Sequence, residues 1–157
     1  MADGIFQNQT EVNAHTDEYG TVIQPNAQPG DIRFKDLNHD GKLDDNDKTF
    51  IGNAFPDLMV GINARLAWKN IDFAANFYGT IGNDVYNTTK GRYSGVSGEN
   101  VYAGTYNASW HGEGTSYDLP RLSYNDANQN WTRVSSFYVE DGSYSVSYTH
   151  LTLPTIA

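Results

Sequence analysis

The strongest pattern along the chain is an alternation of apolar and polar residues over residues 58–78. Every second residue from Leu58 to Trp68 is apolar, and glycine, asparagine and arginine stand among the residues between them. Side chains of a strand point alternately to its two faces, so this spacing predicts one apolar and one polar face. A tight turn at Lys69 and Asn70 and a second alternating stretch complete a predicted β-hairpin.

The first strand of this hairpin is long for a soluble protein. At about 3.3 Å per residue its eleven residues span roughly 36 Å, whereas a strand in a globular protein usually has about 5–6 residues. Such a length suits a tilted strand of a membrane barrel.

The rest of the chain carries weaker patterns. Residues 1–29 are polar without a sustained period, which predicts a loop or an extended arm, and residues 31–36 alternate and predict a short strand. Residues 79–130 lose their period and fill with Gly, Asn, Ser and Tyr. A stretch of that length is typical of a functional surface loop, or of a segment that packs against parts outside the chain. Residues 131–144 contain a few apolar positions followed by a predicted turn.

The charge balance narrows the choice of partner. The 157 residues include 10 Lys+Arg against 19 Asp+Glu, for a formal net charge of −9. Binding phosphates requires clustered basic residues, so we expect no nucleic-acid partner and consider a cation more natural. The absence of cysteine excludes disulfides and thiolate metal sites. No apolar run reaches the roughly 20 residues of a membrane helix, and the first residues do not form a signal peptide.

Residues 36–47 fit the twelve-position calcium loop of the EF-hand and dockerin type. Gly41 stands at the sharp turn, and Leu43 at the apolar position that points inward. The predicted metal ligands are Asp36, Asn38, Asp40, Lys42 through its carbonyl, Asp44 and Asp47.

This loop carries five aspartates and one lysine, a net charge of −4 that bound Ca²⁺ would offset. Asp47 stands where a longer glutamate is usual, and no helical pattern flanks the loop. We therefore predict a structural calcium site rather than a calcium sensor. The alternative is a solvated turn rich in Asp and Asn.

No catalytic constellation stands out, and we expect no enzyme and no cofactor other than calcium. The four histidines are widely separated, and Asp72 and Asp84 are assigned to a strand face and a loop as ordinary solvated charges. The aromatic residues of the later segment are typical of sugar stacking, of the interfacial belts of barrels, or of packing of the loop against itself. These are Tyr78, Tyr86, Tyr93, Tyr102, Tyr106, Trp110 and Tyr117.

Several motifs together resemble the C-terminal part of SusC/RagA-type TonB-linked outer-membrane proteins of Bacteroidetes. The resemblance runs from about Asp3 to Tyr144, with the motifs in the order of the family. They are Pro29-Gly30-Asp31-Ile32-Arg33-Phe34-Lys35-Asp36-Leu37-Asn38, the calcium-type loop, Thr49-Phe50-Ile51-Gly52-Asn53, Pro56-Asp57, Gly82-Asn83-Asp84-Val85-Tyr86-Asn87 and Tyr138-Val139-Glu140-Asp141-Gly142-Ser143-Tyr144.

The resemblance implies an all-β chain that contributes antiparallel strands to a barrel of about 22 strands at the outer membrane. It implies import of glycans or peptides, with a SusD-like lipoprotein as lid and TonB as the power source. A fragment of residues 1–144 without plug, TonB box or signal peptide would transport nothing alone.

In such a barrel the tight turn would face the periplasm, while loops 36–47 and 79–130 would lie outside the cell. The apolar side chains of the hairpin would then face lipid, and the polar ones would face the lumen. The expected lumen residues are Asn63, Arg65, Asp72 and Asn76.

The end of the chain departs from the family pattern, which continues with a basic strand. Residues 145–157 resemble translated sequencing-adapter read-through, so we expect them to be non-native. The alternative to a transporter fragment is a free-standing extracellular calcium-dependent carbohydrate-binding or dockerin-like β-module. The hairpin argues against that alternative, because the sequence supplies few further strands to cover its apolar face.

Overall fold

The computed structural model describes residues 1–94 and 100–152 of the chain, without the side chains of residues 92–94. Most of its regular structure is antiparallel β-sheet, which confirms the predicted all-β class, and the helices are short. None of the helices in this part of the chain has the length and apolar content to cross a membrane. The elements are β1 (Ala2–Ile5), α1 (Gln9–Ala14), β2 (Ile32–Phe34), the 3-10 helix η1 (Asp45–Asp47), β3 (Leu58–Trp68), β4 (Ile71–Ile81), β5 (Asp84–Tyr86), α2 (Thr88–Ser94), α3 (Ala103–Ala108), the 3-10 helix η2 (Ser136–Tyr138), β6 (Val139–Asp141) and β7 (Tyr144–Thr152).

The chain divides into two compact units. Unit 1 holds residues 1–51 and 87–139, and unit 2 holds residues 52–86 and those from 140 onward. The β1–β2 sheet lies in unit 1, and the β3–β4–β7 sheet lies in unit 2. β5 and β6 form a third small sheet.

The hairpin predicted over residues 58–78 is confirmed in unit 2. β3 and β4 pair antiparallel along their whole length, and the two-residue turn between them uses Lys69 with a φ of 53°. This register places the apolar residues of the two strands opposite one another on one face. The facing pairs include Leu58 with Ile81, Ile62 with Phe77, Leu66 with Phe73 and Trp68 with Ile71.

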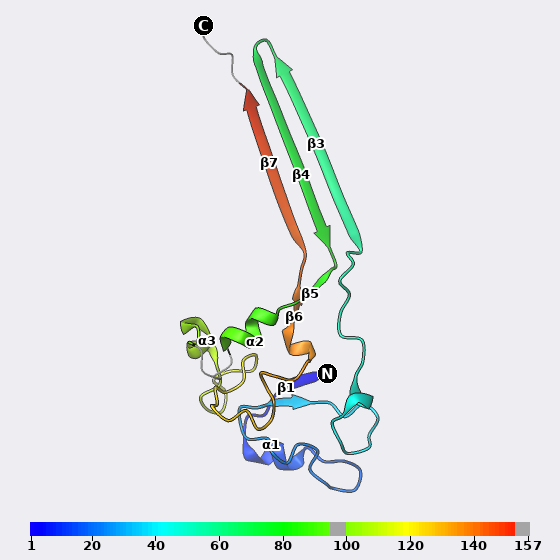
Figure 1. The fold of residues 1–157 in the computed structure, drawn as a ribbon, viewed down its shortest axis with the longest axis vertical. Helices are drawn as coiled ribbons and strands as arrows, with labels where there is room; N and C mark the ends of the chain where they lie inside the picture. The colour runs from blue at the N-terminus through cyan, green and yellow to red at the C-terminus, as the bar shows by residue number, and fades with distance from the viewer. Residues whose placement is uncertain (95–99, 153–157) are drawn as a thin grey trace. The chain divides into compact units, whose positions relative to one another are not determined.

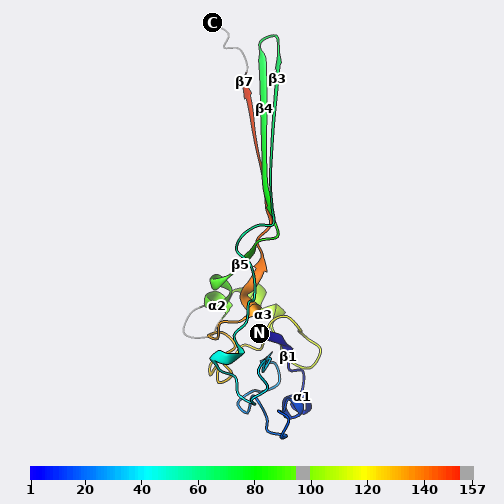
Figure 2. The ribbon, with the colours of Figure 1, turned by 90° about the vertical axis from the view of Figure 1, so that its right-hand side faces the viewer.

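β7 pairs with the other edge of β4, so that three strands lie side by side (Figure 1). Seen from the side, they form a single layer (Figure 2). The residues predicted to be non-native begin within β7, and 153–157 lie outside the described residues. On the apolar face, β7 sets Ser145, Ser147 and Thr149 beside β4. Hydroxyl side chains therefore adjoin an apolar stripe, and the non-native origin of this tail stays a prediction.

The prediction of a loop or extended arm for residues 1–29 is wrong in its first half. β1 pairs with β2, the strand predicted within residues 31–36, and α1 follows with Asn8 as its N-cap. The Asn8 Oδ1 accepts the N–H of Glu11 at 3.0 Å. Because β1 has 4 residues and α1 has 6, both are shorter than the window in which a hydrophobic period can be recognised.

The prediction that residues 79–130 hold no clear element is also wrong in part. β4 continues into this segment, and β5, α2 and α3 follow, although most of the segment is irregular. α2 and α3 have 7 and 6 residues, and α3 has neither a side-chain cap at Tyr102 nor a buried residue. Asn87 precedes α2, and its Oδ1 accepts the Lys90 N–H at 3.1 Å as an N-cap does, whereas no such local signal marks α3. Residues 95–99 of the predicted loop lie outside the described residues.

The interior of unit 1 is as polar as it is apolar. Phe6, Val12 and Ala27 form a small apolar cluster. Buried polar side chains are at least as numerous: Gln7, Gln24, Asp31, Asp36, Asp47, Ser109, Ser116, Asn130 and Ser135. Buried polar groups cost free energy unless they form hydrogen bonds, so their partners decide whether this interior is stable.

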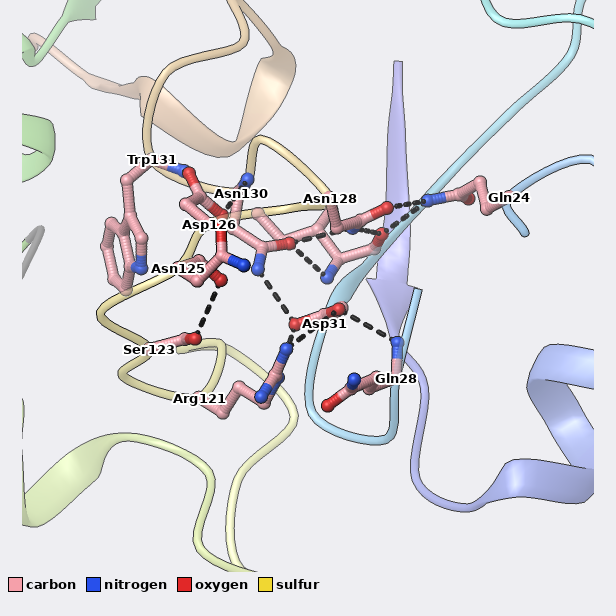
Figure 3. Close-up of polar contacts among 11 residues, drawn as sticks. Gln24, Gln28, Asp31, Arg121, Ser123, Asn125, Asp126, Asn128, Asn130 and Trp131 are labelled. Atoms are coloured by element: carbon pink, nitrogen blue, oxygen red, sulfur yellow. Dashed lines mark hydrogen bonds and ion pairs between the residues drawn. The ribbon is translucent and has the colours of Figure 1, made fainter. Parts of the chain in front are cut away.

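Asp31 is fully buried and lies at the centre of a polar network (Figure 3). Arg121 Nε donates to its Oδ1 at 2.6 Å, and Asn130 Nδ2 donates to the same oxygen at 2.9 Å. The Gln28 N–H donates to Oδ2 at 2.8 Å. The carboxylate is thus paired with a guanidinium and also hydrogen-bonded, the conditions under which a buried charge is tolerated.

The network extends from Asn130 to the backbone of β2. Asn130 Oδ1 accepts the Ile32 N–H at 2.8 Å, and Gln24 Oε1 accepts the Phe34 N–H at 2.8 Å. Asn128 Nδ2 donates to the Ile32 carbonyl at 2.9 Å. Side chains from two distant segments therefore complete the hydrogen bonding of a three-residue strand.

Replacing Asp31 with alanine should destabilise unit 1 by about 3 kcal/mol, because Arg121 and Asn130 would stay buried without their acceptor. Urea denaturation followed by tryptophan fluorescence measures this loss. The matched control is Asp3→Ala, which removes the exposed ion pair with Lys35 (3.2 Å) and should cost less than about 1 kcal/mol. Equal losses in the two variants would contradict the central role of Asp31.

Candidate functional site

The acidic loop of residues 36–47 lies in unit 1, between β2 and η1. Its first and last ligand positions, Asp36 and Asp47, are buried, whereas the predicted ligands between them are exposed. Asp47 closes the loop, since Oδ1 accepts the Leu37 N–H at 2.7 Å and Oδ2 accepts the Asp44 N–H at 2.9 Å. The two ends of the loop are thereby held together.

The turn inside the loop follows the predicted spacing. Asp36 Oδ1 accepts the His39 N–H at 2.7 Å, and Asp36 Oδ2 accepts the Gly41 N–H at 2.8 Å. His39 and Gly41 take φ values of 60° and 77°, in the left-handed region that favours glycine. A Cβ at Gly41 would also lie 2.6 Å from Asp17 Oδ2, so a side chain at this position would clash. Gly41 therefore occupies the sharp turn, as predicted.

The exposed ligand positions bond mainly within the loop. Asn38 Nδ2 donates to Asp40 Oδ2 at 2.8 Å, and the Lys42 N–H donates to Asp40 Oδ1 at 2.9 Å. Asp44 caps η1 through the Asn46 N–H at 2.7 Å. Within residues 1–94 and 100–152, no group of three or more His, Asp or Glu side chains is gathered as a metal cluster. The ligands are thus in sequence around one loop, but the structure does not gather their carboxylates around one point.

Leu43 connects the loop to the rest of unit 1. It is half-buried, and its carbonyl accepts a hydrogen bond from Arg133 at 3.2 Å. The Arg133 guanidinium lies 5.1 Å from the centroid of the Phe34 ring, a cation–π distance. The predicted apolar position is therefore linked to β2 through an arginine 90 positions away, and nothing in the sequence indicated this.

The hydrogen bonds of Asp47 favour its charged form. Burial is the largest single influence and raises the pKa of Asp47, but the N–H groups of Asp44, Leu37 and Asn38, with a further bond from Asp36, together outweigh it. The net effect holds the pKa of this carboxyl below its usual 3.8. Asp47 is therefore a carboxylate at neutral pH, as a calcium ligand must be.

Asp72 and Asp84, the carboxylates considered for a catalytic pair, are not brought together. Asp72 stands near the start of β4 and Asp84 follows its end, where Oδ2 accepts the Asn53 N–H at 2.8 Å. Asp72 lies in a strand as predicted, whereas Asp84, which was predicted to lie in a loop, is the first residue of β5.

The aromatic side chains of the 79–130 segment differ in burial, and only some of them pack against the rest of unit 1. Trp110 donates from Nε1 to Gln7 Oε1 at 3.2 Å and lies against Gly30, so it packs unit 1. Tyr102, Tyr106 and Tyr117 are exposed. The side chain of Tyr93 lies outside the described residues.

Three curated proteins align with the chain, and no protein-family model matches it. TonB-dependent receptor P26 of Formosa agariphila is 31% identical over 90% of the chain, and TonB-dependent receptor P3 of the same organism is 33% identical over 78%. TonB-dependent receptor SusC of Bacteroides thetaiotaomicron is 28% identical over 62%. The chain is a SusC-like TonB-dependent receptor segment.

The chain spans only 13%, 12% and 11% of the length of these three receptors, respectively. TonB-dependent receptors are outer-membrane transporters rather than enzymes.

Acid should weaken unit 1 of the calcium-free SusC-like segment through Asp47. Because the pKa of Asp47 is lowered on folding, its stabilising contribution is full above its usual 3.8 and is lost as the pH falls through the lower folded-state value. Thermal melts in EDTA between pH 7 and pH 2.5 should therefore show a flatter acid limb for Asp47→Asn. The exposed Asp118→Asn is the matched control, and an unchanged limb in Asp47→Asn would contradict this role.

Proposed function

We propose that this segment forms neighbouring wall strands and outer loops of an outer-membrane importer of glycans or peptides. In this proposal the importer draws energy through TonB and works with a SusD-like surface lipoprotein. The observation that carries the proposal is the face of the β3–β4 hairpin.

This face is apolar, in register and uncovered. Leu58, Ile62, Leu66 and Trp68 of β3 are all at least half exposed, and each lies opposite an apolar residue of β4. The opposite face pairs Asn63 with Asn76 and carries Arg65 and Asp72. A strand that alternates apolar outward and polar inward is what a barrel wall between lipid and an aqueous lumen requires.

The turn between β3 and β4 supports one orientation of the wall. It has two residues, whereas the segment after β4 runs through irregular loops and short helices in unit 1. Outer-membrane barrels have short periplasmic and long extracellular connections. We therefore assign the turn to the periplasmic side and unit 1, including loop 36–47, to the cell surface.

A free-standing calcium-dependent β-module is less well supported. In the described part of the chain every residue of β3 is exposed, so no second layer covers its apolar face. A soluble module would expose this stripe to water at a high cost in free energy.

An arginine on the apolar face should prevent assembly, whereas the same change on the polar face should not. The test is a chimaera in which this segment replaces the matching part of SusC. Ile62→Arg near the middle of β3 should destabilise the barrel in lipid by about 2–4 kcal/mol, because it places a charge in hydrocarbon. Heat-modifiable electrophoresis and urea unfolding in lipid measure assembly and stability.

The matched control is Asn63→Arg, one residue away on the opposite face, which should assemble like the parent chimaera. Equal loss in both variants would argue against a lipid-facing stripe. Co-purification of the assembled chimaera with its lipoprotein partner, and growth on the cargo of the recipient receptor, test the partner and the nutrient. Assembly without co-purification would contradict the proposal of a SusD-like partner, but it would not contradict the barrel proposal.

We also propose that loop 36–47 holds one structural Ca²⁺. Its donors would be the side chains of Asp36, Asn38, Asp40, Asp44 and Asp47 and the carbonyl of Lys42. All are hard oxygen ligands, the kind that Ca²⁺ prefers.

The support lies in two buried carboxylates that no cation neutralises. Asp36 and Asp47 are buried close enough to interact, and within the described residues neither forms an ion pair with Lys or Arg. The N–H groups around them already fix the loop ends and the turn at Gly41. A cation would offset the net negative charge of this loop, and all the proposed donors are oxygen atoms of one twelve-residue segment.

Isothermal titration calorimetry of the chain with CaCl₂ should show saturable binding near one ion per chain. Binding should be lost in an Asp36→Ala, Asp40→Ala double variant, which removes two donors. Asp45→Ala is the matched control, because Asp45 lies in the loop outside the donor set and pairs with Lys48 at 2.8 Å. Binding that survives in the double variant, or no binding to the parent chain, would refute the site.

A further inference from the structure

A cavity of about 420 Å³ lies within unit 1, between the acidic loop and the segment before η2. Apolar side chains form part of its wall, including Phe34, Leu43, Ile51 and Val134. The volume is in the range of small-molecule sites, which combine apolar walls with a few placed polar groups. The charged and polar residues of the wall therefore decide what the cavity can hold.

The carboxylates of the wall already have partners. Asp47 accepts two backbone N–H groups, and Asp44 caps η1. Asp45 is paired with Lys48 at 2.8 Å. The wall therefore holds three acidic side chains, of which only Asp45 is paired with a cation, and three basic side chains, Lys35, Lys48 and Arg133.

The basic side chains of the wall differ in whether a carboxylate neutralises them. Lys48 is neutralised by Asp45, and Lys35 pairs with Asp3 at 3.2 Å. Arg133 forms no ion pair with any carboxylate in the described part of the chain, and one of its N–H groups donates to the Leu43 carbonyl. The Phe34 ring and this carbonyl hold the guanidinium in place, and its other N–H donors stay available.

Ser135 also belongs to the wall, but its Oγ is buried, so the side chain must rotate to meet a ligand. Its side chain is 3% exposed, and its Oγ has no hydrogen-bond partner in the structure. A buried hydroxyl without a partner costs free energy, which a bound group could recover. Gln129, also in the wall, takes a φ of 58°, an unusual backbone for a residue with a side chain.

We propose that this cavity binds a small organic carboxylate, with its carboxylate on the Arg133 guanidinium and the Ser135 hydroxyl and its hydrocarbon part against the apolar wall. A planar guanidinium pairs with a carboxylate through two parallel hydrogen bonds, which a neutral ligand cannot replace at equal strength. This site is independent of the barrel proposal, because it does not use the sheet of unit 2. Its wall shares Asp44 and Asp47 with the proposed calcium loop, so it is tested without the metal.

The test is an NMR titration of the ¹⁵N-labelled 157-residue chain in detergent micelles with acetate, butyrate and benzoate, in EDTA. Saturable shifts should be confined to amides around the cavity, and benzamide, the neutral counterpart of benzoate, should bind at least about tenfold more weakly. Arg133→Gln should weaken benzoate binding at least about tenfold, and Ser135→Ala should weaken it several-fold.

Arg65→Gln is the matched control, because Arg65 is exposed on β3 in unit 2 and should leave the affinity unchanged. If Arg133→Gln fails to fold, Arg133→Lys and Ser135→Ala decide the question. Lysine keeps the positive charge and most of the length of Arg133, and alanine differs from Ser135 only by the missing hydroxyl. Equal affinity for benzamide, full affinity in the Arg133 and Ser135 variants, or no saturable shift with any of the three carboxylates would overturn the proposal.

Discussion

The buried carboxylate of Asp31 is the constraint on which unit 1 depends. This unit has a small apolar cluster and many irregular loops, so hydrophobic burial alone fixes few of its segments. Asp31 draws Arg121 and Asn130 to one point, and Asn130 in turn bonds the backbone of β2. Because an unpaired buried charge is so unfavourable, the requirement to satisfy it selects one arrangement of distant loops. Specificity of fold here comes from polar pairing rather than from shape alone.

The polar network around Asp31 also fixes the position of the acidic loop. β2, whose backbone the network bonds, leads directly into Asp36. From the other side Arg133, a few residues beyond Asn130, reaches the carbonyl of Leu43. The loop is therefore attached at its start and near its middle to two segments that the same network organises. Its own aspartates bond the remaining N–H groups, so the loop keeps its turn without a large apolar contact.

The sequence was sufficient where a pattern was long or local. The β3–β4 hairpin spans two eleven-residue strands with one period, and the turn at Gly41 follows from the spacing of one loop. It was insufficient where the cause lies far along the chain. The pairing of Asp31 with Arg121 joins positions 90 residues apart, and nothing near Asp31 indicates its partner. β1 and α1 are shorter than a recognisable period and form because β2 and the apolar cluster hold them.

The two units place their polar and apolar side chains in opposite ways. Unit 1 places polar groups inside and satisfies most of them through hydrogen bonds, with Arg33 Nε, Trp131 Nε1 and Ser135 Oγ as exceptions. This arrangement is suited to a surface in contact with water. Unit 2 exposes an apolar stripe along β3 and β4. Covering this stripe with an apolar surface would remove it from water and lower the free energy. In the described part of the chain β4 is paired along both edges, whereas β3 and β7 are each paired along one edge only. The polar face carries Asn63 and Arg65, so hydrocarbon on one side and water on the other would suit both faces. Unit 1 is thus built for contact with water, whereas unit 2 has one face suited to water and one suited to an apolar surface.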